Sequence, residues 1–305
     1  MRALVKLGPD SNEFKLMDVP IPTINEDELL VSVKAIGVGI HDGYFFPENI
    51  QFPYPIGIEG SGIIEKAGKN FPGFMPGDRI AFVSMQQPKG GTYAEYAALG
   101  KKSLVVHIPP QMSFAQAAAI PVAGNTILKV YQALELKTGQ SIFIAGASGA
   151  IGMFAIPLAV AKGCSVAASA SKKNHDFLKS LGAEKAVDYH DTDWVEQVRQ
   201  WRPDGVDAGI AIQPNTSSQS MDTVKDGGKI ISVSGDRIEA HRNIRVVQLP
   251  YHIDVKDDLL DMFNKIAKKE MPLFIEHIFQ FEDALKALTL KGSRHARGKS
   301  VIVLP

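Results

Sequence analysis

The sequence lacks several features that would assign it to a specialised class of protein. Its 305 residues include one cysteine, Cys164, which excludes an internal disulfide and a cysteine-cluster zinc lobe. Its formal net charge is zero, with 33 basic and 33 acidic side chains, so no general attraction to nucleic acid or to an anionic membrane is expected. No repeat or low-complexity segment is present, and the composition is that of an ordinary globular protein.

Long apolar runs are also nearly missing. Residues 138–161 carry no charge and approach the length of a membrane span, but four glycines and Pro157 interrupt them. A strand, a turn and a buried helix explain the same residues. The amino terminus lacks the apolar core and the cleavage site of a signal peptide, so we expect a cytoplasmic protein that does not bind a membrane.

The chain contains two regions with different patterns of expected secondary structure, and its length also suggests two domains. In the first part, short strand-like runs such as residues 29–35 and 62–67 are separated by turns rich in Gly and Pro, which is typical of an antiparallel barrel or sandwich. From residue 113 onwards strands and helices alternate, with strands expected at 141–145 and 165–170 and a helix between them at 150–162. This order predicts an α/β fold in which helices cover both faces of a parallel sheet.

A glycine-rich turn joins the strand expected at 141–145 to the following helix. Gly146, Gly149 and Gly152 permit a tight turn and a close approach of the backbone to a ligand, while the helix start offers free N–H groups and a positive dipole end. Between a buried strand and a helix, such a turn predicts a site for the pyrophosphate of a dinucleotide. The residues expected to form it are Gly146, Ser148, Gly149, Ala150 and Ile151.

Two alternatives for this turn stay open. The glycines could serve only to pack the helix against the strand. Alternatively, residues 146–150 resemble the nucleophile elbow of a hydrolase, with Ser148 as the attacking hydroxyl, although Ala150 replaces the last glycine of that motif.

The end of the next strand predicts which dinucleotide binds. NAD-selective folds place an acidic residue there to hold the ribose 2′-hydroxyl. Here residues 169–174 contain no carboxylate, whereas Ser169, Ser171, Lys172 and Lys173 offer hydroxyls and positive charge to a 2′-phosphate. We therefore expect NADPH rather than NADH, unless the two lysines only begin a solvated helix.

Several short sequence motifs, spread along the whole chain, together indicate a family resemblance. They are Gly-Ile-Glu-Gly-Ser-Gly at 57–62, Ala-Gly-Asn-Thr at 123–126, the glycine turn, and residues 35–38, 42–44, 74–79, 90–96, 179–183, 226–228 and 297–299. They resemble the medium-chain dehydrogenase/reductase superfamily, and within it the zinc-free quinone oxidoreductase, or zeta-crystallin-like, branch. The resemblance implies a GroES-like β-barrel catalytic domain of residues 1–122 completed by 266–305. It also implies a Rossmann cofactor domain of residues 123–265 with a doubly wound parallel sheet, and a homodimer.

The same motifs indicate whether the chain can bind zinc. Metal-dependent relatives place a cysteine where this chain has Gly39 and a histidine where it has Ile58. Neither residue can ligate zinc, and His41 with Glu59 does not define a metal site. We expect no metal.

Without a Lewis acid, the chemistry that the resemblance implies is hydride transfer from NADPH to a small-molecule quinone or α,β-unsaturated carbonyl. Tyr44 matches a tyrosine in the substrate cleft, where its hydroxyl would hydrogen-bond the carbonyl, and His41 is a candidate proton donor near pH 7. Either side chain could instead be an ordinary packed or surface residue. The arginine and second tyrosine of the family are absent after Tyr44, and Phe46 stands in that region, which favours enones over polar quinones.

Further cofactor contacts follow from the resemblance. They are Thr126 beside the nicotinamide, Tyr189 near the adenosine ribose, and Arg297 and Lys299 from the tail. Ser234 and Gly235 follow a strand at the carboxyl edge, where such sheets bind ligands. Two alternative functions remain: an enoyl-thioester reductase on the same scaffold, and an NADPH-binding sensor or crystallin-like structural protein with little turnover.

Overall fold

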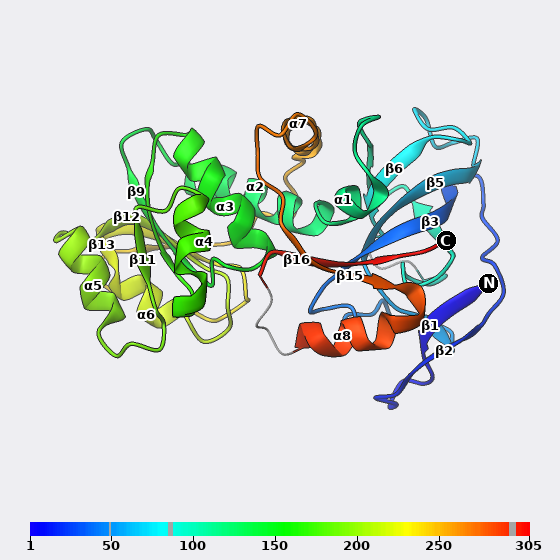
Figure 1. The fold of residues 1–305 in the computed structure, drawn as a ribbon, viewed down its shortest axis with the longest axis horizontal. Helices are drawn as coiled ribbons and strands as arrows, with labels where there is room; N and C mark the ends of the chain where they lie inside the picture. Colours follow the sequence, from blue (N-terminus) through cyan, green and yellow to red (C-terminus); the bar gives the residue numbers. More distant parts are fainter. Residues whose placement is uncertain (49, 85–87, 293–296) are drawn as a thin grey trace. The chain divides into compact units, whose positions relative to one another are not determined.

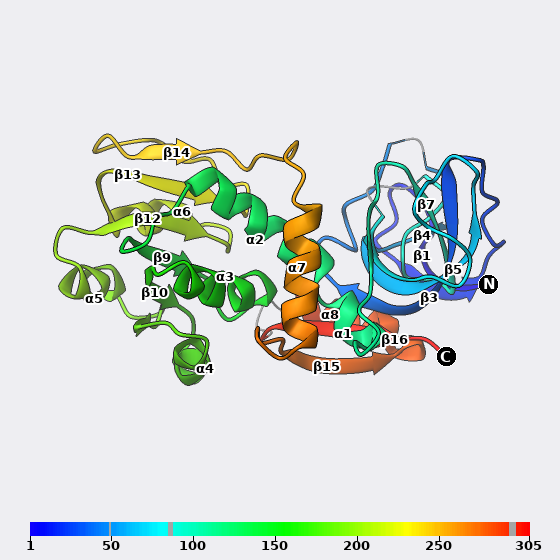
Figure 2. The same ribbon diagram turned by 90° about the horizontal axis from the view of Figure 1, so that it is seen from above.

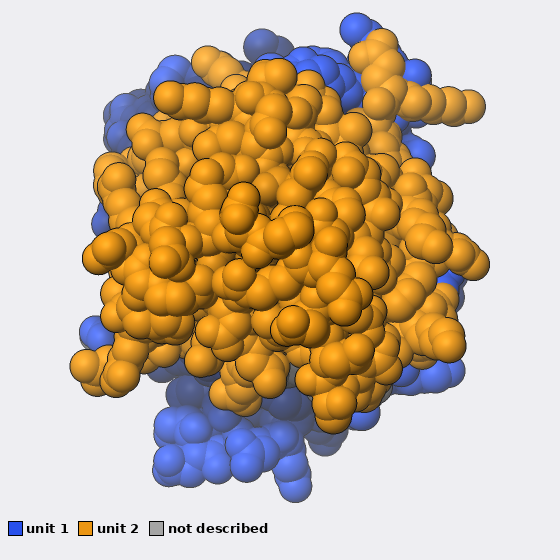
Figure 3. All heavy atoms as spheres, turned by 90° about the vertical axis from the view of Figure 1, so that its left-hand side faces the viewer, with its two compact units in different colours: residues 1–122, 259–268, 275–305 blue, residues 123–258, 269–274 orange. Residues whose placement is uncertain are grey.

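The computed structural model describes residues 1–48, 50–84, 88–292 and 297–305, without the side chains of residues 291 and 292. The chain divides into two compact units, coloured in Figure 3. Unit 1 contains residues 1–122, 259–268 and 275–305, and unit 2 contains residues 123–258 and 269–274. The ranges expected from the sequence place the second boundary later, at 265/266, whereas most of helix α7 (Lys256–Ala267) falls in unit 1.

Unit 2 is built on a six-stranded sheet in the order β11-β10-β9-β12-β13-β14, and Figure 2 labels its strands from β10 to β14. Its elements are α2 (Pro121–Leu134), β9 (Ser141–Ala145), α3 (Ala150–Ala161), β10 (Ser165–Ser169), the 3-10 turn η1 (Lys172–Asn174), α4 (His175–Ser180), β11 (Lys185–Val187), α5 (Trp194–Trp201), β12 (Val206–Ala211), α6 (Ser217–Asp222), β13 (Val224–Ser232) and β14 (Arg245–Val247). All neighbouring strands are parallel, which confirms the doubly wound sheet. The strand order reverses between β9 and β12, so the loops after these strands diverge at the switch point of the sheet.

The core of unit 2 explains its sequence pattern. Strand β9 is buried along its whole length, as its unbroken apolar run predicts. On one face of the sheet, Phe143 stacks on Trp194 of α5 with ring centroids 5.2 Å apart, and Met221 of α6 joins the same cluster. Helices α3 and α4 lie on the other face (Figure 1), as right-handed crossovers require.

The uncharged run 138–161 therefore forms a strand, a turn and a helix. In the part of the chain that the structure describes, no helix is long and apolar enough to cross a membrane.

Unit 1 is mostly antiparallel β-structure. Its elements are β1 (Arg2–Lys6), β2 (Phe14–Asp18), β3 (Glu28–Val38), β4 (Tyr54–Pro55), β5 (Glu59–Ala67), β6 (Arg79–Val83), β7 (Tyr96–Gly100), β8 (Leu104–His107), α1 (Phe114–Ala118), β15 (Ile275–Gln280), the 3-10 turn η2 (Phe281–Asp283), α8 (Ala284–Gly292) and β16 (Lys299–Val303), together with most of α7. One sheet runs β15-β16-β3-β5-β6-β8 with β7 also on β3, and a second runs β2-β1-β4. The pairing of β16 with β3 returns the tail to the first part of the chain, as expected from the sequence. Helix α1 begins at the capping box formed by Ser113 and Gln116.

Candidate functional site

The glycine turn lies at the carboxyl end of β9 and contacts the ends of two neighbouring strands. The N–H of Gly146 donates to Oγ of Ser169, 3.3 Å away, and the N–H of Ala147 donates to the Ser169 carbonyl at 2.9 Å. Gly146 has φ +73°, and a Cβ there would lie 2.4 Å from Cγ of Gln213, the second residue after β12. Glycine is therefore required at this position both by the backbone and by the close neighbour.

Gly149 and Gly152 have different roles. A Cβ on Gly152 would lie 2.3 Å from the carbonyl oxygen of Ala147, so this glycine packs α3 against the turn. On Gly149, with an ordinary φ of −79°, the nearest atom to an added Cβ would be the Gly146 carbonyl oxygen at 3.8 Å. Helix packing alone therefore accounts for Gly152 but not for Gly149, whose open face admits a ligand.

The start of α3 lacks the usual side-chain cap. Gly149 is its N-cap and supplies no side-chain hydrogen bond, and no acidic residue lies in the first turn. The first N–H groups of α3 therefore have no side-chain acceptor at the N-cap. Such N–H groups can donate hydrogen bonds to the oxygens of a pyrophosphate. Among the described residues no hydrogen bond joins Ser148 to a histidine.

The loop after β10 carries the hydroxyls and lysines expected to choose the dinucleotide. Ser169 is buried and its hydroxyl accepts the N–H of Gly146, while Oγ of Ser171 accepts a hydrogen bond from Nδ2 of Asn174 at 3.2 Å. Lys172 and Lys173 are exposed in the turn η1. The structure thus gives the two serines roles within the loop and leaves positive charge at its surface.

An acidic residue that the sequence analysis did not consider lies beside these lysines. Asp188, directly after β11, accepts the backbone N–H of Lys172 at 2.9 Å and both the N–H and Nδ1 of His190 at 3.0 and 2.7 Å. Burial acts to raise the pKa of Asp188, but the hydrogen bonds from His190 and Lys172 outweigh it and lower the pKa below its usual value. The ring of His190 packs on Tyr189, with centroids 4.1 Å apart.

The remaining expected cofactor residues of unit 2 lie in different elements. Ser234 and Gly235 follow β13, where the Ser234 hydroxyl lies 3.0 Å from that of Ser232 and Gly235 has φ +83°. Thr126 is half-buried in α2. Because all strands of the sheet are parallel, the loops after β9, β10, β11 and β13 meet at one edge, and this edge gathers the residues predicted from the sequence, Thr126 excepted. Gln213 and Asp188, which the prediction missed, also follow strands at this edge.

Unit 1 places the two candidate catalytic residues together on one turn after β3. The N–H of Tyr44 donates to the carbonyl of His41 at 3.1 Å, and the N–H of Phe45 donates to the same carbonyl at 2.9 Å. The rings of His41 and Tyr44 meet edge to face with centroids 5.3 Å apart. Tyr44 is 59% exposed, so little of this side chain is needed for packing within unit 1.

A buried polar cluster supports this turn. The carboxylate of Asp42 accepts the N–H of Gly39 at 2.7 Å and the hydroxyl of Tyr93 at 3.0 Å. Burial raises the pKa of Asp42 to about 7, against hydrogen bonds and a nearby lysine that act to lower it. That lysine, Lys299, forms a buried ion pair with Glu59, whose other carboxylate oxygen accepts the N–H of Val122 at 2.7 Å.

The two tail residues differ in burial and in partners. Lys299 is 3% exposed and its ammonium pairs with Glu59 inside unit 1, and its expected contact with the cofactor stays a prediction. The backbone N–H of Arg297 donates to the carboxylate of Glu276 at 2.7 Å, and the residue is partly exposed. Within residues 1–48, 50–84, 88–292 and 297–305, no group of three or more His, Cys, Asp or Glu side chains could hold a metal ion.

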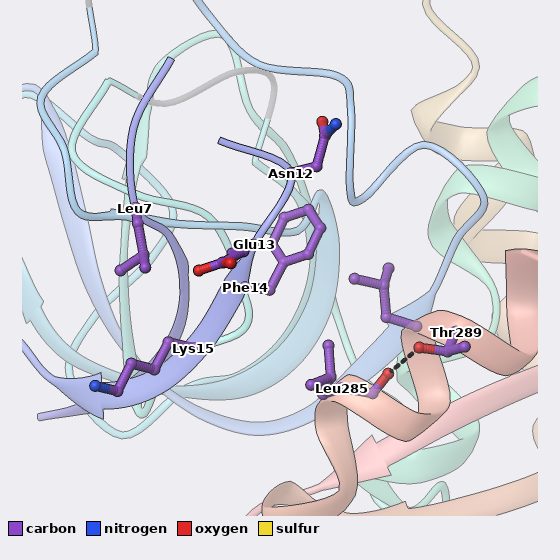
Figure 4. A pocket seen from close by; sticks show the side chains of 8 residues that line it. Leu7, Asn12, Glu13, Phe14, Lys15, Leu285 and Thr289 are labelled. Carbon is purple, nitrogen blue, oxygen red and sulfur yellow. Dashed lines mark hydrogen bonds between the residues drawn. The ribbon is translucent and has the colours of Figure 1, made fainter. Parts of the chain in front are cut away.

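A groove of about 580 Å³ opens elsewhere on unit 1, between β2 and α8 (Figure 4). Its lining residues are Leu7, Asn12, Glu13, Phe14, Lys15, Leu285, Leu288 and Thr289. The Thr289 hydroxyl donates to the Leu285 carbonyl within the helix, 2.9 Å away. No residue predicted to bind cofactor or substrate lines this groove, and we assign it no role in the reaction.

Comparison with known proteins places both units in described families. Residues 25–110 match the family described as "Alcohol dehydrogenase GroES-like domain", and residues 150–257 match that described as "Zinc-binding dehydrogenase". A chloroplastic NADPH-dependent alkenal/one oxidoreductase of Arabidopsis thaliana is 30% identical over 300 residues, which cover 93% of this chain and 74% of the relative. A chloroplastic quinone oxidoreductase of Triphysaria versicolor is 33% identical over 196 residues, 60% of this chain and 58% of the relative.

The chain spans 58% of the length of the first curated relatives that it matches. Among solved structures, the quinone oxidoreductase from Coxiella burnetii superimposes with a TM-score of 0.88 at 29% identity, covering 100% of this chain and 99% of that one. The GroES-like unit and the doubly wound unit agree with these matches. The chain belongs to the medium-chain dehydrogenase/reductase superfamily and, within it, to the quinone oxidoreductase branch.

Proposed function

We propose that this chain is an NADPH-dependent oxidoreductase that transfers hydride to a quinone or an α,β-unsaturated carbonyl without zinc. The observation that carries the proposal is the open face of Gly149 at the uncapped start of α3, where a dinucleotide pyrophosphate fits the free N–H groups. The names of the plant relatives and of the Coxiella burnetii structure support the same reaction class.

The proposed cofactor site is assigned to the carboxyl edge of the sheet in unit 2. Residues 146–151 hold the pyrophosphate; Lys172 and Lys173, with Ser169 and Ser171 shaping their loop, hold the 2′-phosphate. Further contacts within unit 2 are assigned to Thr126, Tyr189, Ser234 and Gly235. NADPH, when bound, supplies the hydride.

The substrate side of the reaction is assigned to the turn that carries His41 and Tyr44. The exposed Tyr44 hydroxyl donates a hydrogen bond to the substrate oxygen, where negative charge develops during reduction. His41, whose ring contacts that of Tyr44, is the proposed proton donor to the substrate. Gly39 and Ile58 offer no metal ligand, in keeping with zinc-free chemistry.

We further propose that the protein works in the cytoplasm as a homodimer, which the resemblance to its branch suggests. Size-exclusion chromatography with light scattering would distinguish the dimer from a monomer of 33.1 kDa.

Oxidation of NADPH, followed at 340 nm, tests the proposed activity. The panel holds a benzoquinone, a naphthoquinone, several enones and an enoyl thioester, with NADH and an added chelator as controls. We expect turnover of an enone or quinone with NADPH that the chelator leaves unchanged. Turnover of the enoyl thioester alone would show that the substrate is an enoyl thioester rather than a quinone or an enone. Tight NADPH binding with no turnover would favour a sensor or structural protein.

A further inference from the structure

Two neighbouring loops of unit 2 hold opposite charges where the adenosine end of the dinucleotide is proposed to bind. The loop after β10 carries Lys172 and Lys173, both exposed. The loop after β11 carries Asp188, Tyr189 and His190. Asp188 and His190 have no part in the site proposed above, although they contact its residues directly.

The Asp188 carboxylate fastens the two loops together. One oxygen accepts the backbone N–H of Lys172 at 2.9 Å, and the other accepts the N–H and the ring Nδ1 of His190 at 3.0 and 2.7 Å. The Asp188 side chain is 13% exposed and that of His190 is 62% exposed. The carboxylate is therefore held in place by donors from both loops, with the imidazole towards solvent.

This arrangement places a fixed negative charge within hydrogen-bonding distance of the Lys172 backbone. The donors hold the pKa of Asp188 below its usual value, despite the opposing effect of burial, so the charge persists at neutral pH. A 2′-phosphate bound beside Lys172 meets this charge, whereas the ribose hydroxyl of NADH does not. Like charges repel, and the uncharged ribose hydroxyl of NADH is not subject to this repulsion.

We infer, on the basis of the proposed function, that Asp188 is a specificity-determining residue that limits the preference for NADPH over NADH, and that His190 moderates this effect by donating to its carboxylate. The lysines after β10 attract the 2′-phosphate, and the acidic residue after the adjacent strand opposes them. The balance between the two loops, rather than the lysines alone, sets the ratio of the two affinities.

The test measures dissociation constants of NADPH and NADH by isothermal titration at low ionic strength, for the wild-type chain and for Asp188→Asn. The asparagine keeps the size of the side chain and one acceptor oxygen but removes the charge. We expect NADPH to bind about three- to tenfold more tightly and NADH to change less than twofold. The gain should shrink when salt is added, because screening weakens the repulsion that the variant removes.

Two further variants separate charge at this site from other effects. Asp191→Asn removes a nearby exposed carboxylate that does not contact Lys172 and should leave the ratio of affinities unchanged. His190→Phe keeps a ring to pack on Tyr189 but removes the side-chain donor to Asp188. It should weaken NADPH about twofold to threefold without affecting NADH, and it tests the inference even if Asp188→Asn fails to fold.

The outcomes distinguish this inference from the proposed function. If the wild-type chain binds neither dinucleotide, the proposed function fails and the inference fails with it. If both bind but Asp188→Asn leaves their ratio unchanged, or weakens both equally, Asp188 only fastens the loops and the inference alone is overturned.

Discussion

The two units use polar groups in opposite ways. At the carboxyl edge of the sheet in unit 2, the α3 N-terminus has no side-chain cap and the face of Gly149 is open. In unit 1, the charged groups of Asp42, Glu59 and Lys299 are buried and bonded to one another or to backbone N–H groups. The first arrangement presents N–H groups without a side-chain cap, whereas the polar groups of the second are hydrogen-bonded or paired within the unit. Polar residues in a family's motifs therefore need their partners identified before a role is assigned.

The largest effect should come from breaking the self-contained cluster. Lys299→Met leaves the Glu59 carboxylate buried without its partner, and we expect a loss of about 3–5 kcal/mol in the free energy of unfolding. Urea unfolding followed by circular dichroism measures the loss.

Two controls accompany this variant. Glu59→Gln with Lys299→Met removes both charges and should recover most of the loss. Arg2→Met breaks an exposed pair with Glu282 and should have no measurable effect. An equal loss in the single and double variants would show that the ion pair is not the cause.

The free energy of unfolding should depend on pH through the buried carboxyl group of Asp42. Burial raises its folded pKa to about 7, above the unfolded value, so its stabilising contribution is complete below about pH 4 and is lost as pH rises through 7. Relative to Asp42→Asn, the wild-type chain should lose up to about 4 kcal/mol of unfolding free energy between these values. Unfolding of both proteins at about pH 5 and pH 8 checks this, and parallel pH profiles would remove Asp42 as the titrating group.

The glycine turn offers a comparison within unit 2. Gly152→Ala places a Cβ against the Ala147 carbonyl and should cost about 1–3 kcal/mol of stability. Gly149→Ala meets nothing closer than 3.8 Å and should keep the wild-type unfolding midpoint. Thermal unfolding of both variants tests the difference, and a destabilised Gly149→Ala would mean that its open face has a structural reason.

The smallest expected effect on stability concerns the exposed turn of unit 1. Tyr44→Phe removes one hydroxyl from a side chain that is 59% exposed, so stability should not change. Turnover of an enone with NADPH should fall roughly tenfold to a hundredfold, because the developing oxyanion loses a donor. Steady-state kinetics separate kcat from KM; unchanged kcat would remove Tyr44 from the reaction.

The fold was largely predictable because its signals are local. The apolar run of β9, the glycine spacing and the alternation of strands and helices all lie within short windows, and the doubly wound sheet is confirmed. Helix α6 and strand β14 are short and lack a strong period, so no local pattern predicts them. The pairing of Glu59 with Lys299, 240 residues apart, leaves no local pattern, so the sequence does not predict it.

The part of the proposed site at the ends of β9 and β10 follows from local sequence signals and stays a prediction. Gln213 and Asp188 were missed because they follow other strands of the same edge, and only the strand order shows that those ends are neighbours. A search of every residue after a predicted strand would have found both.

Titration of NADPH into the wild-type chain and into Gly149→Ala tests the central claim most directly. The account predicts binding by the wild-type chain and at least a tenfold loss of affinity in Gly149→Ala at an unchanged unfolding midpoint, because the methyl group fills the space left for the pyrophosphate. Equal affinities in the two proteins, or no binding to the wild-type chain, would contradict the assignment of this turn to the cofactor.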